Sequence, residues 1–137
     1  MAAETENDDP DDPLERLFLD QEEVDRERLS EVLSGKIGID RETGDPYFLG
    51  EFSDLSNKQK IIIYLLYRKA AVALGKLSDD EEGVQSKEIS DVTGVKYNTV
   101  RGWLPKMDHL ILKDDDKSGY HIPPHSLDEA MEVIADE

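Results

Sequence analysis

Cysteine is absent from the 137 residues, so disulfide bonds and cysteine-based zinc sites are excluded. No apolar run reaches the length needed to cross a bilayer. The first residues, MAAETENDDPDDP, lack the basic and then apolar pattern of a secretory signal. These absences predict a soluble, cytoplasmic protein with no membrane partner.

Basic charge is also scarce, because 16 Lys and Arg stand against 33 Asp and Glu, for a net charge of −17. Residues 1–55 carry 5 basic and 18 acidic side chains, whereas residues 56–137 carry 11 and 15. A nucleic-acid-binding surface normally contains a basic patch. Only the second half is therefore a candidate for contacting DNA, provided that its cations cluster.

The acidic excess also bears on habitat. Asp outnumbers Glu by 18 to 15, and the acidic residues are dispersed, as on the surfaces of proteins from salt-adapted organisms. In molar salt the Debye length is about 3 Å, so overall repulsion from phosphate is largely screened. We therefore expect a halophilic, archaeal protein in which local contacts decide binding.

The chain before the main domain divides into two segments. Residues 1–13 are acidic with almost no apolar content, which predicts a disordered tail. In residues 14–55, apolar spacing predicts a helix that ends at Gly35. Ile37 and Ile39 then alternate with polar or small residues before a Gly- and Pro-containing turn, which predicts a hairpin. We expect this N-terminal helix and hairpin extension to pack on the rest of the chain or on a second copy.

The main domain, residues 56–137, begins at a capping box formed by Ser56 and Gln59. A helix is predicted from there to Gly75. Five Ile and Leu residues between positions 61 and 66 lie nearly all round this helix, which indicates burial on more than one side. The helix would seat the N-terminal extension and the following helices, or supply a dimer contact.

The stretch from Ser86 to Pro123 predicts a helix, a tight turn, a second helix and a hairpin. Ser86 is the predicted cap of the first helix, and Gly94 takes the turn, where freedom to adopt positive φ is useful. Asn98 is the predicted cap of the second helix. Strands are predicted at 110–113 and 120–122. The second helix has an apolar, core-facing stripe of Val100, Trp103, Leu104 and Met107.

Nine residues of this stretch fit the loose pattern E-I-(x)4-G-[LIV]-(x)4-V-(x)3-L-(x)2-[LM] with a following leucine: Glu88, Ile89, Gly94, Val95, Val100, Leu104, Met107, Leu110 and Ile111. With the order of elements, they resemble the winged-helix domains of bacterial and archaeal transcription regulators over about residues 56–134. The resemblance implies a mainly α fold with a small β-wing, a winged helix-turn-helix, here with the N-terminal extension. It also implies a second helix that enters the major groove.

Two residues depart from the pattern of that family. Gly102 offers no side chain to a base. Pro105 lacks an N–H and would clash with the carbonyl of Arg101 unless the helix bends or begins late. We therefore predict a shortened or kinked second helix.

Side chains on the outward face of the second helix are the candidate DNA contacts. Arginine pairs bidentately with guanine and asparagine with adenine, so Asn98, Thr99 and Arg101 are the predicted base readers. Flanking residues and nearby lysines would hold phosphates, although the aspartates 114–116 oppose contact by the hairpin. The alternative is an ordinary solvated helix face. The predicted set is Lys87, Lys96, Tyr97, Asn98, Thr99, Arg101, Lys106, Lys113 and Lys117.

Catalytic and metal-binding signatures are missing from the sequence. It contains no Gly-rich phosphate loop, nucleophile elbow or paired catalytic carboxylates. His121 and His125 are separated by two prolines, which removes the helical i, i+4 geometry that brings two ligands together. We predict a protein that is not an enzyme and that has no metal and no cofactor.

The predicted function is binding of double-stranded DNA by a transcription regulator, acting as a homodimer on paired half-sites. The alternative is a winged-helix protein–protein interaction module, an adaptor or accessory factor, whose acidic N-terminal half docks a basic partner. A continuous positive stripe across Lys87, Lys96, Arg101 and Lys106 would favour DNA. A negative or patchy face would favour the interaction module.

Overall fold

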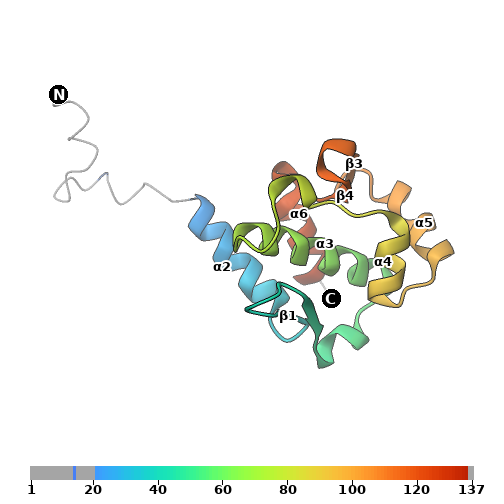
Figure 1. Ribbon diagram of the computed structural model, residues 1–137, viewed down its shortest axis with the longest axis horizontal. Coiled ribbons are helices and arrows are strands. Elements are labelled where there is room, and N and C mark those ends of the chain that lie inside the picture. Colours follow the sequence, from blue (N-terminus) through green and yellow to red (C-terminus); the bar gives the residue numbers. More distant parts are fainter. Residues whose placement is uncertain (1–13, 15–20, 136–137) are drawn as a thin grey trace.

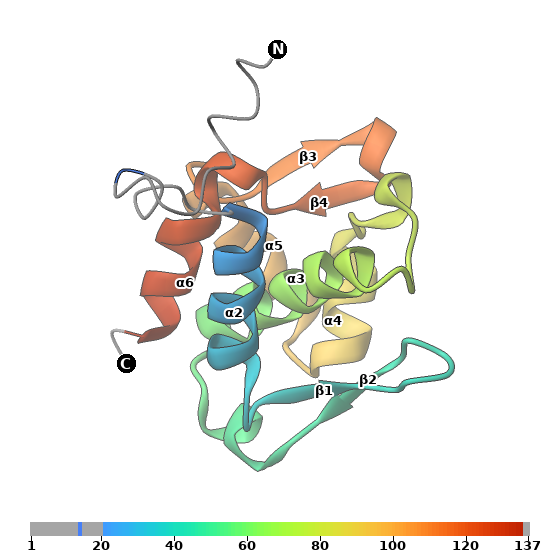
Figure 2. The same cartoon turned by 90° about the vertical axis from the view of Figure 1, so that its left-hand side faces the viewer.

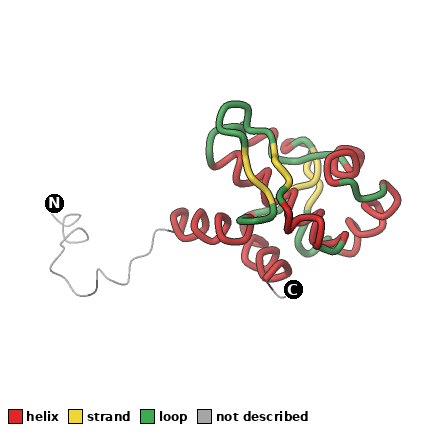
Figure 3. The backbone as a smooth tube through the Cα atoms, turned by 90° about the horizontal axis from the view of Figure 1, so that it is seen from below, coloured by secondary structure: helices red, strands yellow, loops and turns green. Residues whose placement is uncertain are grey.

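The computed structural model describes residue 14 and residues 21–135. The tail predicted for residues 1–13, and residues 15–20 of the extension, lie outside the described residues. The described part is mainly helical, with its strands confined to two short antiparallel hairpins (Figure 1, Figure 3). The helices are α2 (Gln21–Leu33), α3 (Asn57–Ala73), α4 (Ser86–Thr93), α5 (Tyr97–Lys106) and α6 (Leu127–Ala135). The strands are β1 (Ile37–Ile39), β2 (Pro46–Phe48), β3 (Leu112–Asp114) and β4 (Gly119–His121).

Helix α3 forms the centre of the fold. It begins at the predicted capping box, in which Ser56 Oγ accepts the Gln59 N–H at 3.2 Å and Gln59 Oε1 accepts the Ser56 N–H at 3.0 Å. Every side chain from Ile61 to Tyr67 is at most 3% exposed. The helix packs on α2 and β1, and also on α4, α5 and α6. The predicted burial on more than one side is therefore confirmed.

The N-terminal extension packs on the rest of the chain. Its helix α2 ends at Leu33, two residues before Gly35, and β1 pairs with β2, both as predicted. Leu29, Leu33 and Phe52 join the same buried cluster as α3. Arg28 forms an ion pair with Asp128 of α6. The extension and the main domain therefore share one hydrophobic core.

The second hairpin, β3–β4, is tied to the segment that precedes α4. The Val84 N–H donates to the Tyr120 carbonyl at 3.0 Å, and the Tyr120 N–H donates back at 2.7 Å. The two hairpins lie at opposite edges of the molecule, with α3 between them (Figure 2). None of the helices over the described residues is both long and apolar enough to span a lipid bilayer.

Three local predictions differ from the structure. The strand predicted at 110–113 begins only at Leu112, because the Leu110 and Ile111 N–H groups both bind the Met107 carbonyl, at 2.8 and 2.9 Å, and extend the turn after α5. The strand predicted at 120–122 is likewise β4, one residue earlier. Ser86 is not a cap, since α4 begins at that residue with Gln85 at the N-cap.

Candidate nucleic-acid interface

Helix α5 carries most of the predicted contacts, and its orientation follows from its apolar stripe. Val100, Leu104 and Met107 are buried against α3 and α4, and Trp103 is half-buried beside them. The opposite face is therefore turned outward, at the end of the molecule away from α2 (Figure 1). The exposed residues of α5 and its N-cap are Lys96, Tyr97, Asn98, Arg101, Gly102, Pro105 and Lys106, whereas Thr99 is half-buried.

The turn before α5 is held by both its backbone and its side chains. Gly94 has a φ of 82°, in the left-handed region that a side chain makes costly, and its N–H closes α4 on the Ser90 carbonyl at 3.0 Å. The Ser90 hydroxyl donates to the Val95 carbonyl at 2.7 Å, and Thr93 Oγ1 accepts the Val95 N–H at 3.2 Å. These bonds fix the angle between α4 and α5.

The start of α5 shows that the capping prediction for Asn98 is wrong, and its end shows how the helix accommodates Pro105. Lys96 is the N-cap residue, with extended backbone and no side-chain cap bond, so Asn98 lies inside the helix and is not its cap. Pro105 lies one residue before the end of the helix. A proline there removes only the bond to the exposed Arg101 carbonyl, and the helix stops one residue later. Helix α5 has 10 residues and is about 15 Å long.

The cations of α5 are held by aromatic rings. The Arg101 guanidinium lies 5.6 Å from the centre of the Tyr97 ring, and Lys106 Nζ lies 5.3 Å from that of Trp103. Lys96, Arg101 and Lys106 form no ion pair with any residue of the described part, and α5 contains no acidic residue. Ring contact orders Arg101 and Lys106 and leaves their charge available to an anion.

The acidic residues of α4 are occupied by other cations. Glu88 Oε2 accepts the Tyr64 hydroxyl at 3.0 Å and lies 3.5 Å from Arg68 Nη1, so it is drawn towards α3. Asp91 binds Lys87 Nζ at 3.0 Å. Lys87 is therefore exposed but neutralised, and the predicted stripe is not continuous across it.

The hairpin lysines differ from each other. Lys117 Nζ binds Asp79 at 2.7 Å, and this contact raises the pKa of Lys117 and lowers that of Asp79. Lys113 is exposed and lies 5.6 Å from the centre of the Tyr120 ring. Asp114 Oδ1 accepts the Asp116 N–H at 2.9 Å, within the tip of the hairpin. Of the two lysines, Lys113 alone keeps an uncompensated charge among the described residues.

Sequence reasoning missed one cation of this surface. Lys58, in the first turn of α3, places its Nζ 5.8 Å from the centre of the same Trp103 ring that Lys106 approaches. The sequence did hold a signal. Residues 55–78 and 92–107 contain no Asp or Glu, yet carry 8 of the 16 cations. These stretches form α3 and the turn and helix α5, which pack together.

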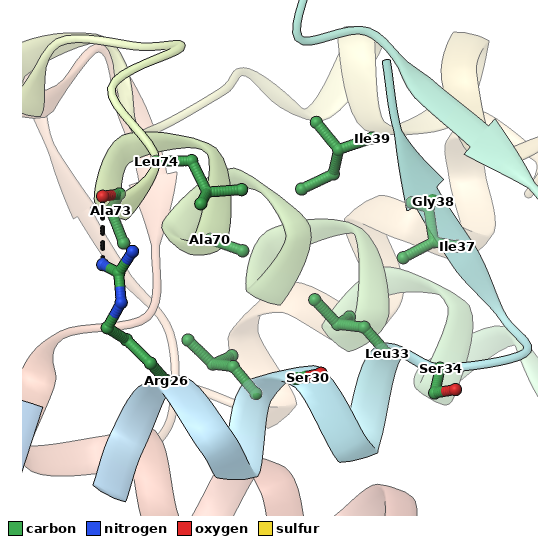
Figure 4. Close-up of a pocket in the computed structure, with 11 residues that line it drawn as sticks. Arg26, Ser30, Leu33, Ser34, Ile37, Gly38, Ile39, Ala70, Ala73 and Leu74 are labelled. Atoms are coloured by element: carbon green, nitrogen blue, oxygen red, sulfur yellow. Dashed lines mark hydrogen bonds between the residues drawn. The ribbon is translucent and has the colours of Figure 1, made fainter. Parts of the chain in front are cut away.

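A second feature of the surface is an apolar pocket of about 440 Å³ between α2, β1 and the end of α3 (Figure 4). Leu29, Leu33 and Ile37 line it, and Arg26 Nη1 donates to the Ala73 carbonyl at 3.1 Å at its edge. The elements α2 and β1, which line one side of the pocket, lie away from α5 (Figure 1).

The histidines do not form a cluster with acidic residues that could hold a metal ion, within residue 14 and residues 21–135. His109 Nε2 lies 3.5 Å from Glu129, and His121, the last residue of β4, is buried. Comparison of the chain with protein-family models, with curated proteins and with solved structures finds no match. The surface is therefore interpreted from its own residues.

Proposed function

We propose that this protein binds double-stranded DNA as a winged-helix transcription regulator, with α5 as the helix that enters the major groove. The observation that carries the proposal is the outward face of α5, where Lys96, Arg101 and Lys106 are exposed and unpaired among the described residues. In a chain of net charge −17, a helix that together with its N-cap carries three cations and no acid is where phosphate would be attracted.

The order of elements supports the same proposal. Helices α4 and α5 are joined by three residues, and the hairpin β3–β4 follows α5, as a wing follows a recognition helix. The Val84–Tyr120 bridge ties the chain before α4 to β4, which places the hairpin beside the helix pair. One edge of the hairpin would lie along the DNA backbone.

The face of α5 offers both kinds of contact that a DNA-binding helix makes. Asn98 and Arg101 are exposed and of the types that read adenine and guanine in the major groove. Lys96 and Lys106 stand at the two ends of the helix, where they would meet phosphates. Gly102, between them, leaves room for the base edges to approach the helix backbone.

In this proposal the predicted lysines outside α5 differ in how readily they can contact the DNA backbone. Lys113 keeps its charge for the DNA backbone, whereas Lys87 and Lys117 must first release Asp91 and Asp79. Exposed ion pairs contribute only about 0.2–1 kcal/mol, so such an exchange is feasible but yields little. The proposal therefore depends on α5, with the wing as a minor contributor.

A homodimer would increase affinity by placing two α5 helices on paired half-sites.

The test is selection of duplexes from a random pool by the full chain, at salt concentrations from 0.1 M to several molar, followed by affinity measurement. Arg101→Ala should lose about 1–3 kcal/mol of discrimination between the selected duplex and a scrambled one. Arg41→Ala is the matched control, because Arg41 is exposed in the turn of the hairpin β1–β2 at another edge of the molecule. Failure to select any duplex at any salt concentration, or equal effects of the two substitutions, would contradict the proposal.

The alternative function is a protein-interaction module, and three observations favour it. The positive stripe predicted across α4 and α5 is interrupted at Lys87, which pairs with Asp91. The pocket between α2, β1 and α3 is lined mainly by apolar side chains. The same extension exposes three consecutive apolar residues, Tyr47, Phe48 and Leu49. With 18 acidic residues against 5 basic ones in residues 1–55, the partner would be basic. This candidate predicts that Leu49→Asp, at an exposed position, abolishes partner binding while Arg101→Ala does not.

A further inference from the structure

Two lysines from different helices meet at one ring. Lys58 Nζ of α3 lies 5.8 Å from the centre of the Trp103 ring, and Lys106 Nζ of α5 lies 5.3 Å from it. Neither ammonium group has an ion-pair partner within residues 21–135. Attraction to the ring restrains both flexible side chains, so one ring orders two positive charges from different helices.

The two lysines present positive charge that has no ion-pair partner among the described residues, and an anionic ligand would supply that partner. The lysine pair lies at the end of α5, the helix whose outward face carries Asn98 and Arg101. Lys106 itself is exposed there. A DNA duplex lying on α5 would bring its backbone to this end of the helix.

We infer that Lys58 and Lys106, ordered by Trp103, form a backbone-phosphate clamp that extends the DNA surface from α5 to the first turn of α3. This inference rests on the proposed function and adds a contact outside the helix pair and the wing. The N-terminal end of α3 adds to the attraction, because the dipole of this 17-residue helix favours an anion there. Trp103 acts as a positioning residue, since it holds the two ammonium groups and need not touch the DNA.

The size of the effect follows from counterion release. Each phosphate contact contributes about −0.9 to the slope of log affinity against log salt for duplex DNA. Removing one lysine should therefore reduce the slope by about 0.9, and removing both by about 1.8. At 0.1 M salt each loss corresponds to about an eightfold weaker affinity, and the difference should vanish near 1 M.

The chain offers a matched control on the same helix. Lys60 is half-buried like Lys58, but its Nζ lies 5.7 Å from the ring of Phe52 in the N-terminal extension. Lys58→Gln and Lys60→Gln thus remove the same charge two residues apart, from surfaces that face different parts of the fold. Lys106→Gln and the double variant Lys58→Gln/Lys106→Gln complete the set. Circular dichroism at each salt concentration confirms that every variant is folded.

The experiment measures affinity of the full chain for a selected duplex between 0.1 and 1 M salt. The inference predicts the reduced slope for Lys58→Gln and Lys106→Gln and an unchanged slope for Lys60→Gln. Trp103 is the sole tryptophan, so its fluorescence should change on titration with the duplex in the wild type and less in the double variant. If Lys58→Gln behaves like Lys60→Gln while Arg101→Ala still loses discrimination, the clamp is overturned and the proposed function stands. If the wild type selects no duplex, the proposed function itself fails.

Discussion

Two glycines, one in the turn before α5 and one inside it, give stability predictions of opposite sign. Gly94 and Gly102 both have open space where a Cβ would be added, with no atom within 4 Å. They differ in backbone conformation, since Gly94 has a φ of 82° and Gly102 lies within α5. Replacing each by alanine therefore isolates the conformational effect from any steric clash.

The magnitudes follow from this difference. An alanine in the left-handed region costs about 1–2 kcal/mol, and reduced freedom of the unfolded chain returns about 0.4–1 kcal/mol. Gly94→Ala should therefore lower the free energy of unfolding by about 1 kcal/mol. Gly102→Ala should raise it by about 0.8–1.0 kcal/mol, because alanine is the better residue inside a helix.

The assay is urea unfolding of both variants and the wild type, followed by circular dichroism, with the slope m held equal. The two variants should differ by about 2 kcal/mol in total. Gly94→Asn is the control, because asparagine tolerates the left-handed region better than alanine, and it should be less destabilising. Shifts of the same sign for Gly94→Ala and Gly102→Ala would refute the reasoning.

Three further predictions concern the core, the central helix and the first hairpin. Leu66→Ala, at a fully buried position of α3, should cost about 2–5 kcal/mol in urea unfolding; a loss below about 1 kcal/mol would show that α3 is not the centre of the core. Ser56→Ala removes the capping box and should cost about 1 kcal/mol, whereas Ser53→Ala, at an exposed position just before α3, should cost less. Hydrogen bonds from the Thr43 N–H and, to a smaller extent, from the Tyr47 hydroxyl lower the pKa of Asp40 to about 2. The contribution of the ionised Asp40 to stability is therefore present above the ordinary pKa of 3.8 and is lost as the pH falls towards 2. The wild type should lose stability relative to Asp40→Asn between pH 4 and pH 2, and parallel acid unfolding of the two proteins would show that these bonds do not form.

Local signals in the sequence were enough for most of the fold. The capping box at Ser56, the turn at Gly94 and the apolar stripe of α5 each depend on residues a few positions apart. Such short-range patterns determine where helices begin, end and face the core. The starts of α4 and α5 were misplaced because a backbone in extended conformation, at Gln85 and Lys96, precedes each helix without a side-chain cap.

The candidate site was predicted less completely, because the charge on a lysine depends on its neighbours in space. The pair of Lys87 with Asp91 is separated by four residues and could have been recognised from helical spacing. Lys117 and Asp79 are 38 residues apart, so their pairing depends on how the hairpin folds back. Lys58 was overlooked because it lies outside the helix pair, and only the packing of α3 on α5 brings it to Trp103.

The most direct test of the central claim is the chemical-shift change of each backbone amide when the 15.5 kDa protein is titrated with its selected duplex. The account predicts that the largest changes fall on α5, on its preceding turn and on Lys58. Amides of α2 and the hairpin β1–β2 should move little, because they lie away from α5 (Figure 1). Changes centred on the pocket between α2, β1 and α3, with α5 unaffected, would contradict the account.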